Sequence, residues 1–149
     1  MPLPGPVGPT DPPSWGNRPT YSVGVDRGEK VASLERAYRL FNERRIDDLL
    51  AMMIDDIRWP DVPHGIVLEG KPAIRRYWEA QFAVTAPHVV PTGFVEVDDD
   101  LVAVIDQRIF DQGGHLLMEP SVVYHRYSFT TGLISRMTVF GTREDAVTP

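Results

Sequence analysis

The sequence predicts an α+β fold in which three helices precede a strongly bent, mostly antiparallel sheet. Apolar residues recur at helical spacing in three segments before residue 85. After Pro87 the period changes to the alternation typical of strands, and turn signals divide this part into four runs. Helices and strands that are segregated along a chain pack as separate layers, so we expect the sheet to wrap over the helices.

The first helix is expected to begin at Asp26, which forms a capping box with Glu29 three residues later. Asn42 and the polar residues that follow it end this helix. Its apolar stripe consists of Val31, Leu34, Tyr38 and Phe41. A second, short helix carries Ile46, Leu49, Leu50 and Met53 on one face and stops at Asp55 and Asp56.

Ile57 and Trp59 alternate with Arg58, which predicts a short strand that ends at Pro60. Residues 60–70 are expected to form a loop, and Pro72 suits the first turn of a third helix. That helix would bury Ile74, Tyr77, Trp78 and Phe82.

The four later strands are predicted from turn signals at residues 98–100, 111–114 and 130–132. They are expected at residues 88–97, 101–110, 115–129 and 133–140. Because proline cannot donate to a strand ladder, Glu119-Pro120 predicts a bulge or bend inside the third of them.

The chain divides into three parts by composition. Residues 1–28 are rich in proline and glycine, which favours an extended tail that Trp15 and Tyr21 could attach to the domain surface. Residues 29–142 form the expected domain, and residues 143–149 a C-terminal tail. A tail of this kind could instead recruit a partner protein.

The composition excludes several function classes. The 149 residues include no cysteine, which rules out disulfides, thiolate catalysis and cysteine–zinc sites. A net charge of −6 without a basic block argues against nucleic acid and anionic membranes as partners. No apolar run is long enough to span a bilayer and no secretory signal is evident, so we expect a cytoplasmic protein. The four histidines show no metal-ligand spacing, and no metal or other cofactor is expected.

Five segments together resemble the nuclear transport factor 2-like superfamily, in its ketosteroid isomerase and SnoaL-like polyketide cyclase branch. They are residues 37–42, 46–50, 54–59, 68–74 and 132–137, and the resemblance covers about residues 29–142. It implies a cone-shaped barrel with a ligand-sized pocket. The fold alone implies no single function, because it hosts isomerases, cyclases, epoxide hydrolases, dehydratases and proteins without chemistry.

The resemblance also implies roles for single positions. The general base of the isomerases corresponds to Asp61, and their second oxyanion donor, a carboxylic acid, corresponds to His125. Their oxyanion tyrosine corresponds to Ala37, one residue before Tyr38, so the oxyanion hole departs from the isomerase pattern.

The limonene-type epoxide hydrolases of the same superfamily use an Asp–Arg–Asp arrangement. Here the first two positions hold Asp106 and Arg108 in reversed order, and Thr138 replaces the second aspartate. Water addition to an epoxide is therefore the less favoured activity.

Strand alternation independently groups the candidate residues into rows. Asp106 and Arg108 share one face of their strand, as do His125 and Tyr127 on the next. The row on the last strand consists of Arg136, Thr138 and Phe140. If these rows face the pocket, they join Asp61, Tyr38, Trp59 and Trp78 in an apolar cavity with a few polar groups, the usual makeup of a ligand site.

The favoured hypothesis is a cofactor-independent isomerase or cyclase acting on a hydrophobic, carbonyl-bearing small molecule. Asp61 would be the base, with His125 as donor to the developing enolate and Arg108 or Arg136 as further orienting groups. The alternative is a non-catalytic, homodimeric binding protein. In that case Asp106, Arg108 and Arg136 would belong to a dimer contact on the sheet face.

Overall fold

The computed structural model describes residues 26–149, which form four helices and a six-stranded sheet. Trp15, Tyr21 and the rest of residues 1–25 lie outside this range. The helices are α1 (Arg27–Asn42), α2 (Ile46–Leu50), α3 (Lys71–Val84) and α4 (Arg143–Ala146). The strands are β1 (Met53–Asp61), β2 (Ile66–Glu69), β3 (Ala86–Val97), β4 (Asp100–Phe110), β5 (Ser121–Thr130) and β6 (Leu133–Phe140).

The helices begin and end where local chemistry favours it. Asp26 accepts a hydrogen bond from the Glu29 backbone at 2.8 Å, and the Glu29 side chain accepts one from the Asp26 backbone, so the predicted capping box is confirmed. Pro72 lies in the first turn of α3, also as predicted.

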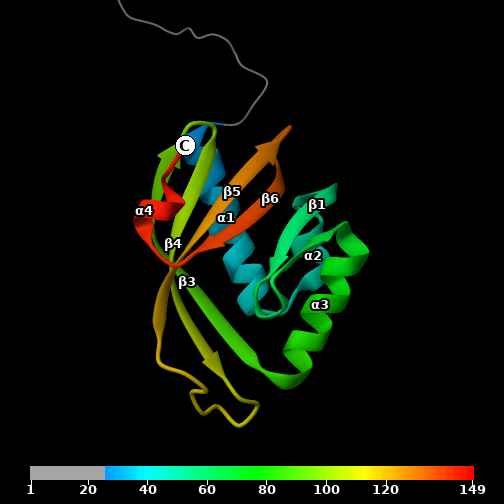
Figure 1. Cartoon of the computed structure of the whole chain (residues 1–149). Helices are drawn as coiled ribbons and strands as arrows, with labels where there is room; N and C mark the ends of the chain where they lie inside the picture. The colour runs from blue at the N-terminus through cyan, green and yellow to red at the C-terminus, as the bar shows by residue number, and fades with distance from the viewer. Residues whose placement is uncertain (1–25) are drawn as a thin grey trace, which may run out of the picture.

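The sheet has the strand order β2-β1-β6-β5-β4-β3. All neighbours are antiparallel except β1 and β6, which run parallel, so the sheet is mixed. Register shifts interrupt the ladder between Pro91 and Gly93 on β3 and between Ser128 and Phe129 on β5. Such irregularities bend a sheet, and the sheet curls around α1 without closing (Figure 1). The expected α+β cone is therefore confirmed.

The hydrophobic core fills the space between the helices and the concave face of the sheet. Leu34 of α1, Ile74 of α3 and Ile105 of β4 are completely buried there. A second, smaller cluster lies on the convex face, where Val102 packs with Ala146 of α4. Both faces of β4 are thus covered along part of its length.

Three strand predictions differ from the structure. β1 already begins at Met53, so Asp55 and Asp56 lie within a strand rather than after a helix. Residues 60–70 contain the strand β2, which pairs with β1. The strand expected at 115–129 begins only after Pro120, and Leu116 makes a single bridge to Phe110.

Candidate functional site

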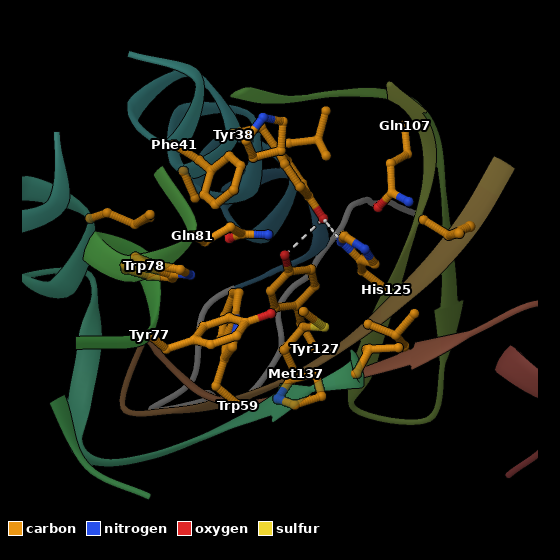
Figure 2. A pocket seen from close by; sticks show the side chains of 18 of the residues that line it. Tyr38, Phe41, Trp59, Tyr77, Trp78, Gln81, Gln107, His125, Tyr127 and Met137 are labelled. Carbon is orange, nitrogen blue, oxygen red and sulfur yellow. Dashed lines mark hydrogen bonds between the residues drawn. The ribbon is translucent and has the colours of Figure 1, made fainter. Parts of the chain in front are cut away.

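A cavity of about 380 Å³ lies between α1, α3 and the concave face of the sheet. Its walls are mostly apolar and aromatic, and Figure 2 shows side chains from both helices and from the sheet pointing into it. The lining residues are Ala37, Tyr38, Phe41, Leu49, Met53, Trp59, Pro60, Val62, Pro63, Tyr77, Trp78, Gln81, Pro87, Val89, Gln107, Ile109, Met118, Val123, His125, Tyr127, Ile134, Met137 and Val139.

Aromatic pairs form the wall on the side of α3. The rings of Trp59 and Trp78 meet edge to face with centroids 5.3 Å apart. Phe41 meets Trp78 in the same way at 6.1 Å. Edge-to-face contacts stabilise aromatic clusters beyond their area burial, so this wall is preorganised. Trp59 and Trp78 therefore lie where the sequence analysis expected them.

Three polar side chains form a hydrogen-bonded chain inside the cavity. The Tyr127 hydroxyl donates to the Tyr38 hydroxyl over 2.7 Å, and the Tyr38 oxygen lies 2.8 Å from Nδ1 of His125 (Figure 2). These residues come from α1 and β5, and all three are almost completely buried. Buried polar groups are tolerated when they satisfy one another, as they do here.

Burial sets the charge state of this network. It lowers the pKa of His125 to about 4, so the imidazole is neutral at pH 7. Burial also raises the pKa of Tyr127 and of Tyr38, and both remain protonated phenols. When Tyr127 donates to Tyr38, the Tyr38 proton is left to donate to Nδ1, which places the His125 proton on Nε2. Residues 26–149 provide no partner for that Nε2–H, so a ligand acceptor can take it.

Asp61 lies in the wall but does not itself line the cavity. Its side chain is 8% exposed, and its two sequence neighbours, Pro60 and Val62, are lining residues. Its Oδ2 lies 2.8 Å from Nδ1 of His64, and its Oδ1 accepts the His64 backbone N–H at 3.3 Å. The pKa of Tyr77, which lines the cavity, is raised by burial and further by the charge of Asp61. The negative charge of Asp61 therefore acts on a residue of the cavity wall, although the carboxylate itself is hydrogen-bonded to His64.

Two of the predicted rows lie on the convex face of the sheet. On β4 the cavity is lined by Gln107 and Ile109, which alternate with Asp106 and Arg108. Asp106 and Arg108 pair with each other at 3.4 Å and are both partly exposed.

On β6 the cavity is lined by Ile134, Met137 and Val139, and the row Arg136, Thr138 and Phe140 is turned away from it. Phe140 packs against the convex-face cluster. The prediction that the β4 and β6 rows line the pocket is therefore wrong for all five residues, which are Asp106, Arg108, Arg136, Thr138 and Phe140. Alternation predicts which residues of a strand share a face, but not which face is the inner one. Because β4 carries apolar residues on both faces, its sequence does not identify the inner face.

The cavity also contains polar residues that the sequence analysis did not select. Gln81 follows Tyr77 by four positions and Trp78 by three, so it continues the inner stripe of α3. A polar residue in an apolar stripe is the signal that could have identified it. Gln107 occupies the corresponding place on β4, between Ile105 and Ile109.

No group of three or more histidine or acidic side chains that could hold a metal ion occurs in residues 26–149. Within the same residues, no helix is long and apolar enough to cross a membrane.

The SnoaL-like domain model matches residues 34–137, which is more than half of the chain. The chain belongs to the SnoaL-like domain family. This SnoaL-like domain also shares the nuclear transport factor 2-like fold of its structural neighbours. None of the curated protein sequences matches it.

Three solved structures illustrate the similarity of fold. SalBIII, an epoxide hydrolase/cyclase-like enzyme of pyran ring formation in polyether salinomycin, is 18% identical with a TM-score of 0.67, over 80% of this chain and 95% of that one. A Mycobacterium tuberculosis protein in complex with estradiol-17β-hemisuccinate is 17% identical with a TM-score of 0.65, over 78% and 95%. An NTF2-like protein of unknown function from Burkholderia pseudomallei is 18% identical with a TM-score of 0.66, over 81% and 98%. At these identities the SnoaL-like domain shares their fold, and its chemistry must be argued from its own cavity.

Proposed function

We propose that this protein is a cofactor-independent isomerase or cyclase that acts on a hydrophobic, carbonyl-bearing small molecule by acid/base proton transfer. The observation that carries this proposal is the neutral His125 at the wall of an aromatic cavity, with Tyr38 occupying its Nδ1 and Nε2–H left for a ligand. A buried neutral imidazole can donate its Nε2–H to a developing enolate and does not have to be protonated to imidazolium to do so.

In the proposed reaction the ligand carbonyl accepts a hydrogen bond from Nε2–H of His125. The Asp61 carboxylate takes a proton from the carbon next to that carbonyl, which breaks a C–H bond and moves its electron pair into the enolate. Asp61 then returns the proton to another carbon, which completes an isomerisation. If the enolate carbon instead attacks an internal carbonyl, a ring closes and Asp61 protonates the new alkoxide.

His64 would release the Asp61 carboxylate for this step. At present both carboxylate oxygens of Asp61 accept hydrogen bonds from His64, whose side chain is 74% exposed at the molecular surface. Rotation of an exposed imidazole is inexpensive compared with moving a packed residue. A change of the Asp61 rotamer, which also breaks the hydrogen bond from the His64 backbone N–H, would then turn the carboxylate toward the cavity that its neighbours Pro60 and Val62 line.

Two structural neighbours add support from analogy. SalBIII is an epoxide hydrolase/cyclase-like enzyme, and the Mycobacterium tuberculosis protein holds a steroid derivative. Both facts support a hydrophobic, oxygen-bearing molecule as the ligand class of this protein. The analogy supports the ligand class and leaves the reaction to be tested.

Proton exchange at carbon tests the proposal without knowledge of the natural substrate. A panel of ketones in D₂O is incubated with the protein, and loss of the α-proton NMR signals is followed. We expect exchange with the wild type, a loss of at least about 100-fold in Asp61→Asn, and no change in Asp106→Asn, because removing a general acid/base costs 10²–10⁴-fold. Asp106→Asn is the same chemical change on the convex face. Equal exchange by Asp61→Asn and the wild type would remove Asp61 from the mechanism.

A non-catalytic binding protein is the second candidate, because Asp61 is satisfied by His64 and does not line the cavity. This candidate predicts ketone binding with no exchange in any variant. Hydrolysis of an epoxide has less support, since Asp106 and Arg108 lie outside the cavity.

We further propose that the convex face of the sheet holds a second copy of the chain. On this face the half-exposed Val90 and the more exposed Val122 flank Asp106 in adjacent strands, and Arg108 lies beside them. A row that carries both an acid and a base can pair with its own copy about a twofold axis. Light scattering should give the mass of a dimer for the wild type and a shift toward monomer for Val122→Asp. A monomeric wild type at high concentration would exclude this interface.

A further inference from the structure

The polar groups of the cavity indicate what kind of ligand it accepts. Every one of the side chains that line it, within the described residues 26–149, is uncharged. A charge buried without a partner costs several kcal/mol or more, whereas a neutral polar group needs only one or two hydrogen bonds. An anionic ligand would in addition lie close to Asp61, a buried carboxylate that stands in the chain between the lining residues Pro60 and Val62.

Two glutamine side chains stand out on these walls. Gln81 comes from α3 and Gln107 from β4, and both amides point into the cavity (Figure 2). Neither side chain has a hydrogen-bond partner among residues 26–149. Both residues are partly buried. A primary amide offers two donors and one carbonyl acceptor, and an amide that a ligand would cut off from water needs new hydrogen-bond partners. The two amides are thus suited to a polar group that arrives with the ligand.

Gln107 and His125 start from different levels of the cavity. Ala103 is the register partner of His125, and Gln107 follows Ala103 by four residues along β4, roughly 13 Å of strand. The step from Ala103 to Gln107 runs toward the open end of the cavity, where the lining residues Val62 and Met118 are 59% and 52% exposed. Gln81 lies near the end of α3, where the neighbouring Phe82 carbonyl accepts a hydrogen bond from Gln112, two residues beyond β4, so Gln81 and Gln107 lie toward the same end of the cavity. The cavity therefore has an inner polar site at His125 and an outer polar site at Gln81 and Gln107, with apolar walls between them.

We propose that the cavity takes an uncharged, flat, ring-containing molecule with two oxygen functions, one bound by His125 and the other by Gln81 and Gln107. This inference rests on the proposed small-molecule function of the cavity. It specifies that the ligand is uncharged and carries two polar groups. It also assigns the two glutamines as residues that determine specificity. Rings in the ligand are favoured because the walls carry the Trp59, Trp78, Phe41 and Tyr127 rings, and aromatic rings pack well against the faces and edges of other flat rings.

The charge is tested with three naphthalenes of nearly equal shape. They are 2-acetyl-6-methoxynaphthalene, the 6-methoxy-2-naphthoate anion and the (6-methoxynaphthalen-2-yl)methylammonium cation, and binding is followed by thermal shift and isothermal calorimetry at pH 7.5. We expect the neutral ketone to bind at least about 100-fold more tightly than either ion, because neither ion finds a counter-charge on the wall. Equal or tighter binding of the naphthoate or of the ammonium ion overturns the proposal, and so does a failure of the ketone to bind at millimolar concentration.

The role of the glutamines is tested with Gln81→Leu and Gln107→Leu. The ligands are 2-acetyl-6-methoxynaphthalene and 2-acetylnaphthalene, which lacks the second oxygen. Each variant should weaken binding of the methoxy compound about 5- to 10-fold, the effect of one hydrogen bond, and leave binding of 2-acetylnaphthalene within about twofold. Gln112→Leu is the matched control, since Gln112 is exposed and bonds to the Phe82 carbonyl outside the cavity. An equal loss for both ligands would assign the glutamines a structural role and contradict the proposal.

These readouts separate this inference from the proposed function. Selective binding of the neutral ketone without α-proton exchange would leave the ligand class standing and remove the enzyme activity. α-Proton exchange without a preference for uncharged ligands would support the enzyme activity and contradict the proposed ligand class.

Discussion

The Tyr38 hydroxyl on α1 lies 2.8 Å from Nδ1 of His125 on β5, although 87 positions separate the two residues in the chain. This contact ties the first helix to the centre of the sheet by a buried hydrogen bond. It also decides which nitrogen of His125 faces a ligand. The same pair therefore links the stability of the fold to the chemistry of the cavity.

Replacing Tyr38 by phenylalanine should destabilise the protein by about 1–3 kcal/mol, because Nδ1 of His125 and the Tyr127 hydroxyl both lose a buried partner. The measurement is urea unfolding followed by circular dichroism. Tyr77→Phe is the matched control, since the Tyr77 hydroxyl has no hydrogen-bond partner among residues 26–149. Equal losses in the two variants would show that the Tyr38 contact contributes nothing of its own.

Stability should fall as the pH is lowered from about 6.5 to about 4. Burial depresses the pKa of His125 to about 4 in the folded state, against about 6.5 in the unfolded chain. Between these values the unfolded state binds a proton that the folded state does not, so the free energy of unfolding decreases by up to roughly 3 kcal/mol. The change is absent above pH 6.5 and complete below pH 4.

Comparing unfolding free energies at pH 7.5 and pH 5 for the wild type and His125→Asn isolates this effect, because all other titrating groups are shared. The residues packed against His125 from α1 and from its own strand are Tyr38 and Tyr127, which stay neutral in this range. An identical pH dependence of the two proteins would mean that folding does not lower the pKa of His125.

Gly65→Ala should cost about 1–2 kcal/mol, since Gly65 has φ +66° and a left-handed conformation disfavours a Cβ atom. No atom lies within 4 Å of the position that the new Cβ would take, so the cost is conformational and not steric. Gly141→Ala is equally unobstructed but is not in the left-handed region. It should be neutral in the same thermal unfolding experiment, and a loss as large as that of Gly65→Ala would disprove this explanation.

Arg126→Lys should loosen α4 from the convex face. The Arg126 guanidinium donates to the Asp100 carboxylate at 2.8 Å and to the carbonyl oxygens of Ala146 and Thr148, a set of contacts that a single ammonium cannot reproduce. We expect a loss of about 1 kcal/mol and faster hydrogen exchange in residues 143–148. Arg58→Lys, in an exposed pair with Glu69, should leave both quantities unchanged.

Much of the fold could be predicted because its signals are local. The capping box at Asp26, Pro72 at the start of α3 and the turns between the last four strands each depend on a few neighbouring residues. β2 has only four residues and is exposed on most of its length, so no alternation marks it. The parallel pairing of β1 with β6 depends on residues far apart in the chain, which no local pattern encodes.

The candidate site divides in the same way. Tyr38, Trp59, Trp78, His125 and Tyr127 could be placed because each lies on a clear apolar stripe or strand row. Asp106, Arg108 and the row on β6 could not, since β4 is covered on both faces and the inner face is chosen only when the sheet folds. The role of Asp61 remains a prediction.

The parallel pair of β1 and β6 also constrains the order in which the chain can fold during synthesis. Met53 pairs with Ile134, so one edge of the strand that carries Trp59 waits for a partner roughly 80 residues downstream, while its other edge pairs with the nearby β2. At a translation rate of 5–20 residues per second this delay is roughly 4–16 s. Through that interval this edge of β1 has no partner, and pairings of such long range also slow folding itself. The nascent chain, with its hydrophobic face uncovered, is therefore the state in which chaperone binding or aggregation would compete most strongly with folding.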